Sequence, residues 1–174
     1  SILTDGLTRL KLPANGMIFD KLSRYTAAIE AWNPAYGLVG ASGDTLTIKH
    51  ILDSLAPLCV IDSLCASIRE QRGVAFPVKL VDLGTGAGLP GIPLAIARPE
   101  LELTLLDRMS RRIHFLETMK NELSLDNVDI MEQQVERAKG SWDLITFRAF
   151  RPFERKLFKR VFAVCAKDGY VLAY

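Results

Sequence analysis

Four glycines lie close together at positions 84, 86, 88 and 91, in the sequence Val81-Asp82-Leu83-Gly84-Thr85-Gly86-Ala87-Gly88-Leu89-Pro90-Gly91. Glycine permits positive φ angles and lets a ligand approach the backbone closely. An apolar run precedes the loop and a helical pattern follows it, which is the frame of nucleotide-binding loops. The alternative is a glycine-rich turn that holds no ligand, and the upstream acid Asp82 counts against it.

Two kinds of ligand compete for this loop. Residues 86–91 match the dinucleotide fingerprint G-x-G-x-x-G, in which a pyrophosphate binds free N–H groups at a helix N-terminus. Pro90 and Pro93 remove two such donors. Residues 82–88 read D-x-G-x-G-x-G and resemble the first motif of class I S-adenosylmethionine-dependent methyltransferases. That ligand carries an ammonium group and no phosphate, and Asp82 is placed to supply a negative charge near it.

A second acid, Asp107, ends the next apolar run, 19 positions after Gly88. A carboxylate at this place can accept hydrogen bonds from both ribose hydroxyls of an adenosine ligand. The alternative is a solvated aspartate at the end of a strand. The spacing to the glycine loop favours the ribose acceptor.

The elements that position these residues change in character near residue 77. Before it the pattern is helical, with helices predicted over residues 19–33, 48–55 and 60–72. Asn33-Pro34 is expected to end the first helix, because a residue that precedes proline is disfavoured in the α conformation. Residues 1–76 are therefore expected to form an N-terminal helical extension packed on the core.

After residue 77 strands and helices alternate. Strands are predicted over residues 79–83, 101–106, 127–131, 142–147 and 170–174, with helices over 91–97, 110–123 and 153–166. The alternation predicts an α/β fold, a Rossmann-like parallel doubly wound sheet with its ligand at the carboxyl ends of the strands. Residues 77–174 are expected to be an S-adenosylmethionine-binding methyltransferase core that lacks its last strands.

Composition excludes several classes of protein. The 174 residues carry a net charge of only +2, and the three cysteines include no C-x-x-C pair. The two histidines, His50 and His114, lie far apart, so we expect no disulfide framework and no metal site. No apolar run of membrane-spanning length and no secretory signal are visible. We therefore expect a cytoplasmic protein that binds no membrane. A monomer is also expected, although composition does not bear on the oligomeric state.

The chain resembles the RsmG/GidB family, bacterial methyltransferases that modify N7 of a guanine in small-subunit (16S) ribosomal RNA. The resemblance is carried by Trp32-Asn33, His50–Ser54, Val81–Pro93, Thr104–Asp107, Arg111-Arg112, Phe115-Leu116 and Trp142–Ala149. It implies S-adenosyl-L-methionine as cofactor and ribosomal RNA or the small ribosomal subunit as partner. It also implies a cofactor site in which the Val135-Glu136 pair flanks the adenine. The predicted cofactor-binding residues are Asp82, Gly84, Gly86, Gly88, Leu89, Asp107, Val135, Glu136 and Arg148.

Arg148 follows the fourth predicted strand, where the resemblance places a catalytic arginine beside the transferring methyl group. Guanine N7 has an in-plane lone pair and carries no proton, so it can attack without a general base. Catalysis can then come mainly from alignment. The arginine should contact guanine O6 or a phosphate, because a bond donated to N7 would occupy the attacking lone pair. The alternative for Arg148 is a strand-end salt bridge to Glu136 or Asp107.

Basic residues gather between positions 148 and 160, where six stand against one acid. Phe150 and Arg151 in this segment, with Arg111 and Arg112, are the predicted RNA contacts. For the other rings we favour an amphipathic helix that buries its apolar face, made of Phe153, Leu157, Val161 and Phe162. His50 and Asp53 are read as groups that join the N-terminal helices to the sheet rather than as catalytic groups. A methyltransferase for small molecules and a non-catalytic binding module remain the alternatives for function.

Overall fold

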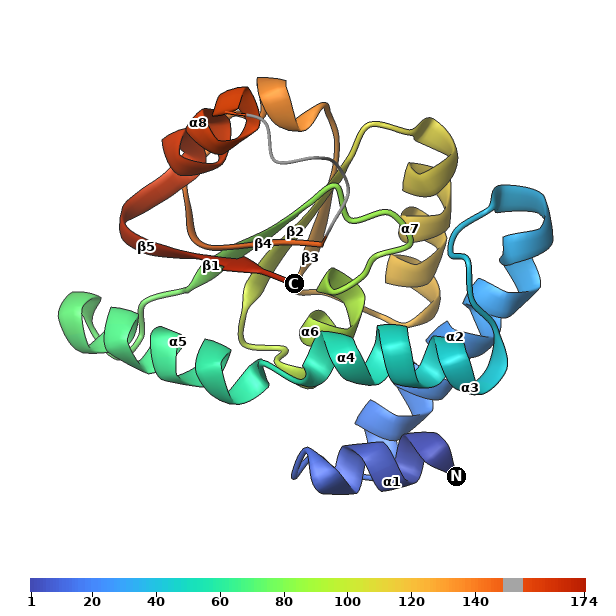
Figure 1. Cartoon of the computed structure of the whole chain (residues 1–174). Coiled ribbons are helices and arrows are strands. Elements are labelled where there is room, and N and C mark those ends of the chain that lie inside the picture. The colour runs from blue at the N-terminus through green and yellow to red at the C-terminus, as the bar shows by residue number, and fades with distance from the viewer. Residues whose placement is uncertain (149–154) are drawn as a thin grey trace.

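The computed structural model describes residues 1–148 and 155–174 (Figure 1). Its centre is a sheet of five parallel strands in the order β3-β2-β1-β4-β5. The strands are β1 (Lys79–Leu83), β2 (Glu102–Asp107), β3 (Val128–Glu132), β4 (Trp142–Phe147) and β5 (Cys165–Ala173). The predicted α/β architecture is therefore confirmed. All four strand pairs run parallel, so the strands end at one common edge, which holds the glycine loop.

The two central strands, β1 and β4, have the bounds predicted from the sequence. Their side chains are buried on both faces, apart from Lys79 at the start of β1. A parallel sheet covered by helices on both sides requires such continuous apolar runs. The edge strand β5 starts five residues earlier than predicted, at Cys165. Asp168 has a φ of 63° and lies where the pairing of β5 with β4 shifts register, so the strand continues through an irregularity.

The N-terminal part is helical, as predicted. It contains α1 (Ile2–Arg9), α2 (Gly16–Tyr36), α3 (Gly43–Leu46), the π turn η1 (Thr47–Leu52), α4 (Asp53–Leu55) and α5 (Leu58–Arg72). The expected helix end at Asn33-Pro34 is wrong, because α2 runs through Pro34 and ends before Gly37 in a left-handed conformation. The Asn33 side chain supports this end: its Oδ1 accepts hydrogen bonds from the N–H groups of Leu38 and Val39.

Helices cover both faces of the sheet (Figure 1). The α-helices of the N-terminal part, α6 (Gly91–Ala97) and α7 (Ser110–Glu122) share one large core with the sheet. The opposite face is covered by the short 3-10 helix η2 (Val135–Arg137) and by α8 (Arg155–Val164). The N-terminal helices therefore belong to the same packed core as α6, α7 and one face of the sheet.

The amphipathic helix α8 buries Leu157 and Val161, as predicted. Phe162 was expected to be buried with them, but it is 62% exposed and its ring stacks on that of Phe158. Phe162 follows Val161, and one residue turns the side chain by about 100° around a helix, away from the buried face. Phe153 lies outside the described residues.

The helical run Gly43–Arg72 has the length and the apolar composition of a membrane span. The sequence was expected to contain no such segment, and by length and composition that expectation is wrong. Core helices of soluble proteins can have the same length and composition. Here Leu46, Ile51, Leu55 and Ile61 are fully buried and pack in the larger core.

Candidate cofactor and methyl-transfer site

Asp82 lies beneath the glycine loop and holds its two ends together. One carboxylate oxygen accepts hydrogen bonds from the Thr85 hydroxyl at 2.6 Å and the Gly91 N–H at 3.0 Å. The other accepts a hydrogen bond from the Thr146 hydroxyl of β4 at 3.0 Å. Burial raises the pKa of Asp82 to about 6, and these hydrogen bonds oppose the rise. The carboxylate has no exposed surface, so the structure leaves it no direct contact with a ligand in the cavity.

Asp107 is buried as well, with 2% of its surface exposed, and it supports the same loop from the end of β2. Its Oδ2 accepts a hydrogen bond from the Gly86 N–H at 2.9 Å, and its Oδ1 accepts one from the Met109 N–H at 3.0 Å. Arg112 forms an ion pair with Oδ2 at 3.4 Å. The alternative of a solvated strand-end aspartate is therefore wrong.

A cavity of about 220 Å³ opens beside Asp107. Its lining residues are Gly84, Asp107, Arg108, Met109, Arg112, Gln133 and Val135. Three of the predicted cofactor-binding residues, Gly84, Asp107 and Val135, thus meet in one cavity although they lie far apart in the sequence.

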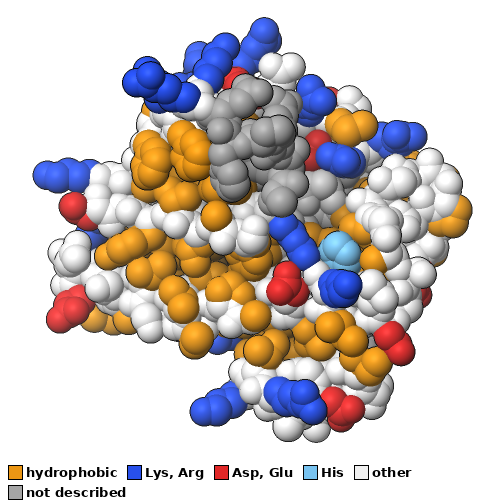
Figure 2. All heavy atoms as spheres, in the orientation of Figure 1, with side chains coloured by type: hydrophobic (Ala, Val, Ile, Leu, Met, Phe, Trp, Pro, Cys, Tyr) orange, Lys and Arg blue, Asp and Glu red, His pale blue; other side chains and the backbone are white. Residues whose placement is uncertain are grey.

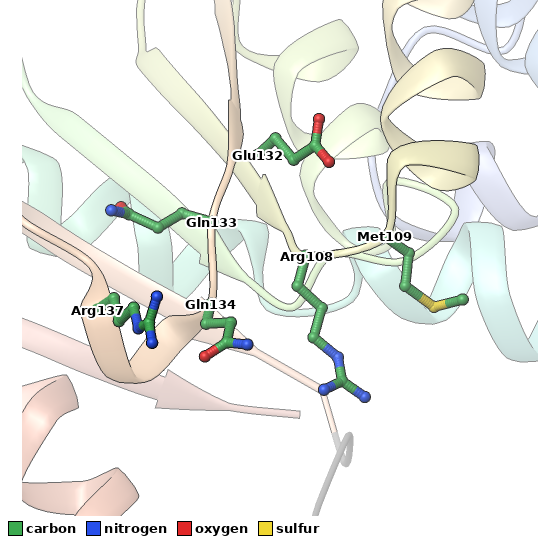
Figure 3. A pocket seen from close by; sticks show the side chains of 6 residues that line it. All are labelled: Arg108, Met109, Glu132, Gln133, Gln134 and Arg137. Carbon is green, nitrogen blue, oxygen red and sulfur yellow. The ribbon is translucent and has the colours of Figure 1, made fainter.

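A larger hollow of about 560 Å³ adjoins this cavity and shares Arg108, Met109 and Gln133 with it. Figure 3 shows its lining, where Arg108 and Gln134 extend in the same direction from two neighbouring strand ends. Sequence reasoning did not propose Arg108 or Arg137 as site residues. For Arg108 the sequence offered a signal, because this residue directly follows Asp107, a predicted site residue.

The loop itself fits a ligand held against its backbone. Gly86 has a φ of +62°, and a Cβ built on it meets no atom within 4 Å, so this side of the loop is open. Gly88 has a φ of +94°, and a Cβ there would lie 2.5 Å from Ile92 Cδ1, so that glycine serves the packing of α6. Leu89 is almost fully buried. Six other residues predicted to bind the cofactor do not line these two cavities: Asp82, Gly86, Gly88, Leu89, Glu136 and Arg148.

The predicted RNA contacts are placed differently from one another. Arg111 is exposed at the start of α7, while Arg112 turns toward Asp107 and the cavity. Phe150 and Arg151 lie outside the described residues.

Arg148 follows β4 and reaches across to the N-terminal helices. Its Nη2 donates hydrogen bonds to the carbonyl oxygen of Lys49, at 2.5 Å, and to Asp53 Oδ2, at 3.1 Å. The alternative for Arg148 was a salt bridge to Glu136 or Asp107, and the salt bridge in the structure is formed with Asp53. Asp53 thus joins the N-terminal helices to the sheet, as expected.

Two tyrosines make further connections at this edge. The fully buried Tyr25 of α2 donates a hydrogen bond from its hydroxyl to the carbonyl of Ala87 in the glycine loop, at 2.7 Å. Tyr174 donates one to the carbonyl of Ser54, at 3.1 Å. From the sequence, Tyr25 was only one residue of the helix predicted over residues 19–33. Its hydroxyl shows that the N-terminal helices hold the loop directly.

The parallel sheet, the glycine loop after β1 and the acid at the end of β2 define a class I S-adenosylmethionine-dependent methyltransferase. The chain belongs to the family described as GidB: rRNA small subunit methyltransferase G, whose model matches residues 18–174. Both the family and the fold class predicted from the sequence are thereby confirmed.

Curated relatives carry the same description. The chain is 39% identical over 149 residues to ribosomal RNA small subunit methyltransferase G of Hydrogenovibrio crunogenus. The matched residues make up 84% of this chain and 62% of that protein. The chain is 35% identical over 176 residues to the protein of that name from Legionella pneumophila strain Corby, covering 99% and 76%. The match thus spans roughly two thirds of these relatives' length.

Solved structures agree in fold. A Staphylococcus aureus protein assigned as a caffeoyl-CoA O-methyltransferase superposes with a TM-score of 0.53 and 13% identity, over 85% of this chain and 65% of that one. A Methanococcus maripaludis protein assigned as an S-adenosylmethionine-dependent methyltransferase gives a TM-score of 0.50 and 19% identity, over 63% and 54%. At these identities the likeness concerns the fold alone.

Proposed function

We propose that this protein transfers a methyl group from S-adenosyl-L-methionine to N7 of a guanine in small-subunit ribosomal RNA. The observation that carries the proposal is the meeting of Gly84, Asp107 and Val135 in one cavity at the carboxyl edge of the sheet. Ligands of open α/β sheets bind at this edge. The names of the curated relatives supply the substrate class, small-subunit ribosomal RNA.

Each residue of the site has a distinct task in this proposal. Asp107 accepts a hydrogen bond from a ribose hydroxyl, and the backbone at Val135-Glu136 reads the edge of the adenine. The glycine loop from Gly84 to Leu89 lies against the amino-acid part. The cofactor, when bound, supplies a methyl group on a sulfonium, which is already activated for transfer.

Arg148 is the proposed catalytic residue. Its guanidinium donates to guanine O6 or to a phosphate and leaves the N7 lone pair free for attack. The target nitrogen carries no proton, so no side chain has to remove one. The chain's contribution is then alignment of the two reactants, which can lower a barrier by up to roughly 7–11 kcal/mol.

RNA binding rests on basic side chains near this edge. Arg111 and the exposed Arg155, Lys156 and Lys159 of α8 are available to phosphates. Figure 2 shows such basic side chains gathered at one end of the visible face. Phe150 and Arg151 complete the proposed contact.

We further propose that the protein acts in the cytoplasm as a monomer. Among residues 1–148 and 155–174, no group of three or more His, Cys, Asp or Glu side chains could hold a metal ion. The proposed chemistry needs no metal.

The test is transfer of a labelled methyl group. The protein is incubated with labelled S-adenosylmethionine and, separately, naked 16S ribosomal RNA and assembled small subunits, and the label is then mapped. Label at N7 of a guanine supports the proposal. Label on a small metabolite alone would favour the small-molecule methyltransferase, and binding of cofactor and RNA without transfer would favour the non-catalytic module.

A further inference from the structure

The helical run that crosses the carboxyl edge of the sheet contains a π turn, Thr47–Leu52. At the end of this turn the N–H of Asp53 donates to the carbonyls of His50 and Ile48. In a regular α-helix the same N–H would donate to the carbonyl of Lys49. The N–H that would use the Lys49 carbonyl in an α-helix is thus bonded elsewhere, and this carbonyl accepts a hydrogen bond from a side chain. Single π turns within helices occur frequently at functional sites.

The donor that uses this carbonyl is Arg148. Its Nη2 lies 2.5 Å from the Lys49 carbonyl oxygen and 3.1 Å from Asp53 Oδ2. A backbone carbonyl and a carboxylate one helical turn apart therefore both accept hydrogen bonds from this nitrogen. The guanidinium is planar and rigid, so fixing Nη2 also fixes the direction of Nη1. Nη1 is buried and has no hydrogen-bond partner among the residues that the structure describes.

A buried charged N–H group without a partner is costly, and native proteins rarely retain one without a reason. We propose that the π turn and Asp53 form a positioning device that holds Nη1 of Arg148 ready for an acceptor on the methyl-accepting nucleotide. This inference rests on the proposed function and extends it: Asp53 is a positioning residue, and the oxygen that Nη1 lacks is supplied by the substrate.

The surroundings support such a device because they hold the turn in place. The Ser54 hydroxyl donates to the carbonyl of His50, and the carbonyl of Ser54 accepts the hydroxyl of Tyr174 beyond β5. The turn is thus tied to the ends of two strands, at Arg148 and at Tyr174. Burial raises the pKa of Asp82, of Tyr25 and of Tyr174, and the Arg148 charge opposes the rise in all three. The Arg148 guanidinium therefore lies near the glycine loop, near α2 and near the end of β5.

The experiment compares Asp53→Ala and Asp53→Asn with a matched control, Asp62→Asn. Asp62 pairs with Arg98 at 2.7 Å on neighbouring elements, and its exposure of 44% resembles the 53% of Asp53. Transfer to small-subunit ribosomal RNA is measured at varied concentrations of each substrate. We expect Asp53→Ala to lower kcat by about tenfold to 100-fold with the KM for S-adenosylmethionine within about twofold, since small misplacements are costly in an alignment mechanism. Asp53→Asn, which keeps an acceptor, should lie between it and the unaltered chain.

A double-variant cycle separates positioning from a general loss of structure. When Asp53→Ala is added to Arg148→Lys, kcat should fall by less than about twofold further. The lysine has no planar guanidinium whose second nitrogen Asp53 and the Lys49 carbonyl could orient. The loss in melting temperature of the double variant should likewise be smaller than the sum of the losses of the two single variants. A kcat of Asp53→Ala equal to that of the unaltered chain would overturn this inference and leave the proposed function standing. Additive losses in both kcat and melting temperature would do the same. Absence of transfer by the unaltered chain would overturn the proposed function, and the inference with it.

Discussion

The carboxylate of Asp107, at the end of β2, accepts the backbone N–H of Gly86, in the loop after β1, at 2.9 Å. The residue proposed to hold the ribose therefore also supports the loop that faces the rest of the cofactor. An ionised carboxylate offers about four acceptor positions. Gly86, Met109 and Arg112 use up to three of them, which leaves room for a ribose hydroxyl. A ligand bound at Asp107 and the loop conformation are thus coupled.

Replacing Asp107 by Ala should weaken S-adenosylmethionine binding more than tenfold. The variant loses hydrogen bonds to a charged acceptor, each worth about 1.5–3 kcal/mol, and also the support of the Gly86 N–H. Isothermal titration calorimetry measures the effect. Asp129→Ala is the control, because that carboxylate on β3 is 91% exposed and lies 3.9 Å from Lys120. A dissociation constant that changes equally little in both variants would speak against the ribose site.

Two glycines of the loop should respond differently to alanine. A Cβ on Gly91 would lie 2.2 Å from Leu105 Cδ2, in a fully buried place, so Gly91→Ala should cost about 3 kcal/mol of unfolding free energy. Gly86 has open space but a φ of +62°, so Gly86→Ala should cost only about 1 kcal/mol while it weakens cofactor binding. Gly40→Ala, with nothing within 4 Å, is the neutral control. Urea unfolding checks the order, and equal losses at positions 86 and 91 would contradict the loop geometry.

Asp82 should make stability depend on pH in a defined direction. Its pKa is about 6 in the folded protein, against 3.8 for an ordinary aspartate, so the folded state holds the proton more tightly than the unfolded state. The resulting stabilisation is complete below about pH 4 and is lost as the pH rises through 6, by about 3 kcal/mol. In Asp82→Asn this part of the pH dependence should disappear, since the amide can accept from Gly91 and donate to Thr146. Denaturant unfolding from pH 4 to 8 tests it, and parallel curves for the two proteins would refute the assignment.

The same charge predicts how cofactor binding depends on pH. An ionised Asp82 favours a cationic ligand above the loop, and protonation below about pH 6 removes that attraction. The dissociation constant of S-adenosylmethionine should therefore rise as the pH falls from 8 to 5 in the unaltered protein more than in Asp82→Asn. A difference between the two proteins that stays constant over this range would show that the charge does not act on the ligand.

Local patterns identified the sheet, and together with the family resemblance they identified three of the seven residues that line the proposed cofactor cavity. β1 and β4 were predictable to the residue, because strands buried on both faces read as continuous apolar runs. Gly84 follows β1 and Asp107 ends the adjacent strand β2, so both were expected at the carboxyl edge of the sheet, where they meet in the cavity.

What the sequence did not predict depends on contacts between distant segments. Asp53 and Arg148 are 95 positions apart, and no local signal indicates which carboxylate an arginine reaches. The π turn and the hydrogen bond of Tyr25 to the loop arise in the same way, from the packing of the N-terminal helices on the sheet. Phe162 was predicted to be buried by counting apolar positions, although its angle on α8 turns it outward.

The most direct test of the account is the methyl-transfer reaction of Arg148→Ala with labelled S-adenosylmethionine and small ribosomal subunits. The control is Arg24→Ala, which removes an arginine whose guanidinium bonds to the carbonyl of Glu122 on the surface. We expect transfer to guanine N7 by the unaltered protein and by Arg24→Ala. Arg148→Ala should give no measurable transfer, although it keeps its circular dichroism spectrum and binds the cofactor. Turnover by Arg148→Ala equal to that of the unaltered protein would contradict the central claim.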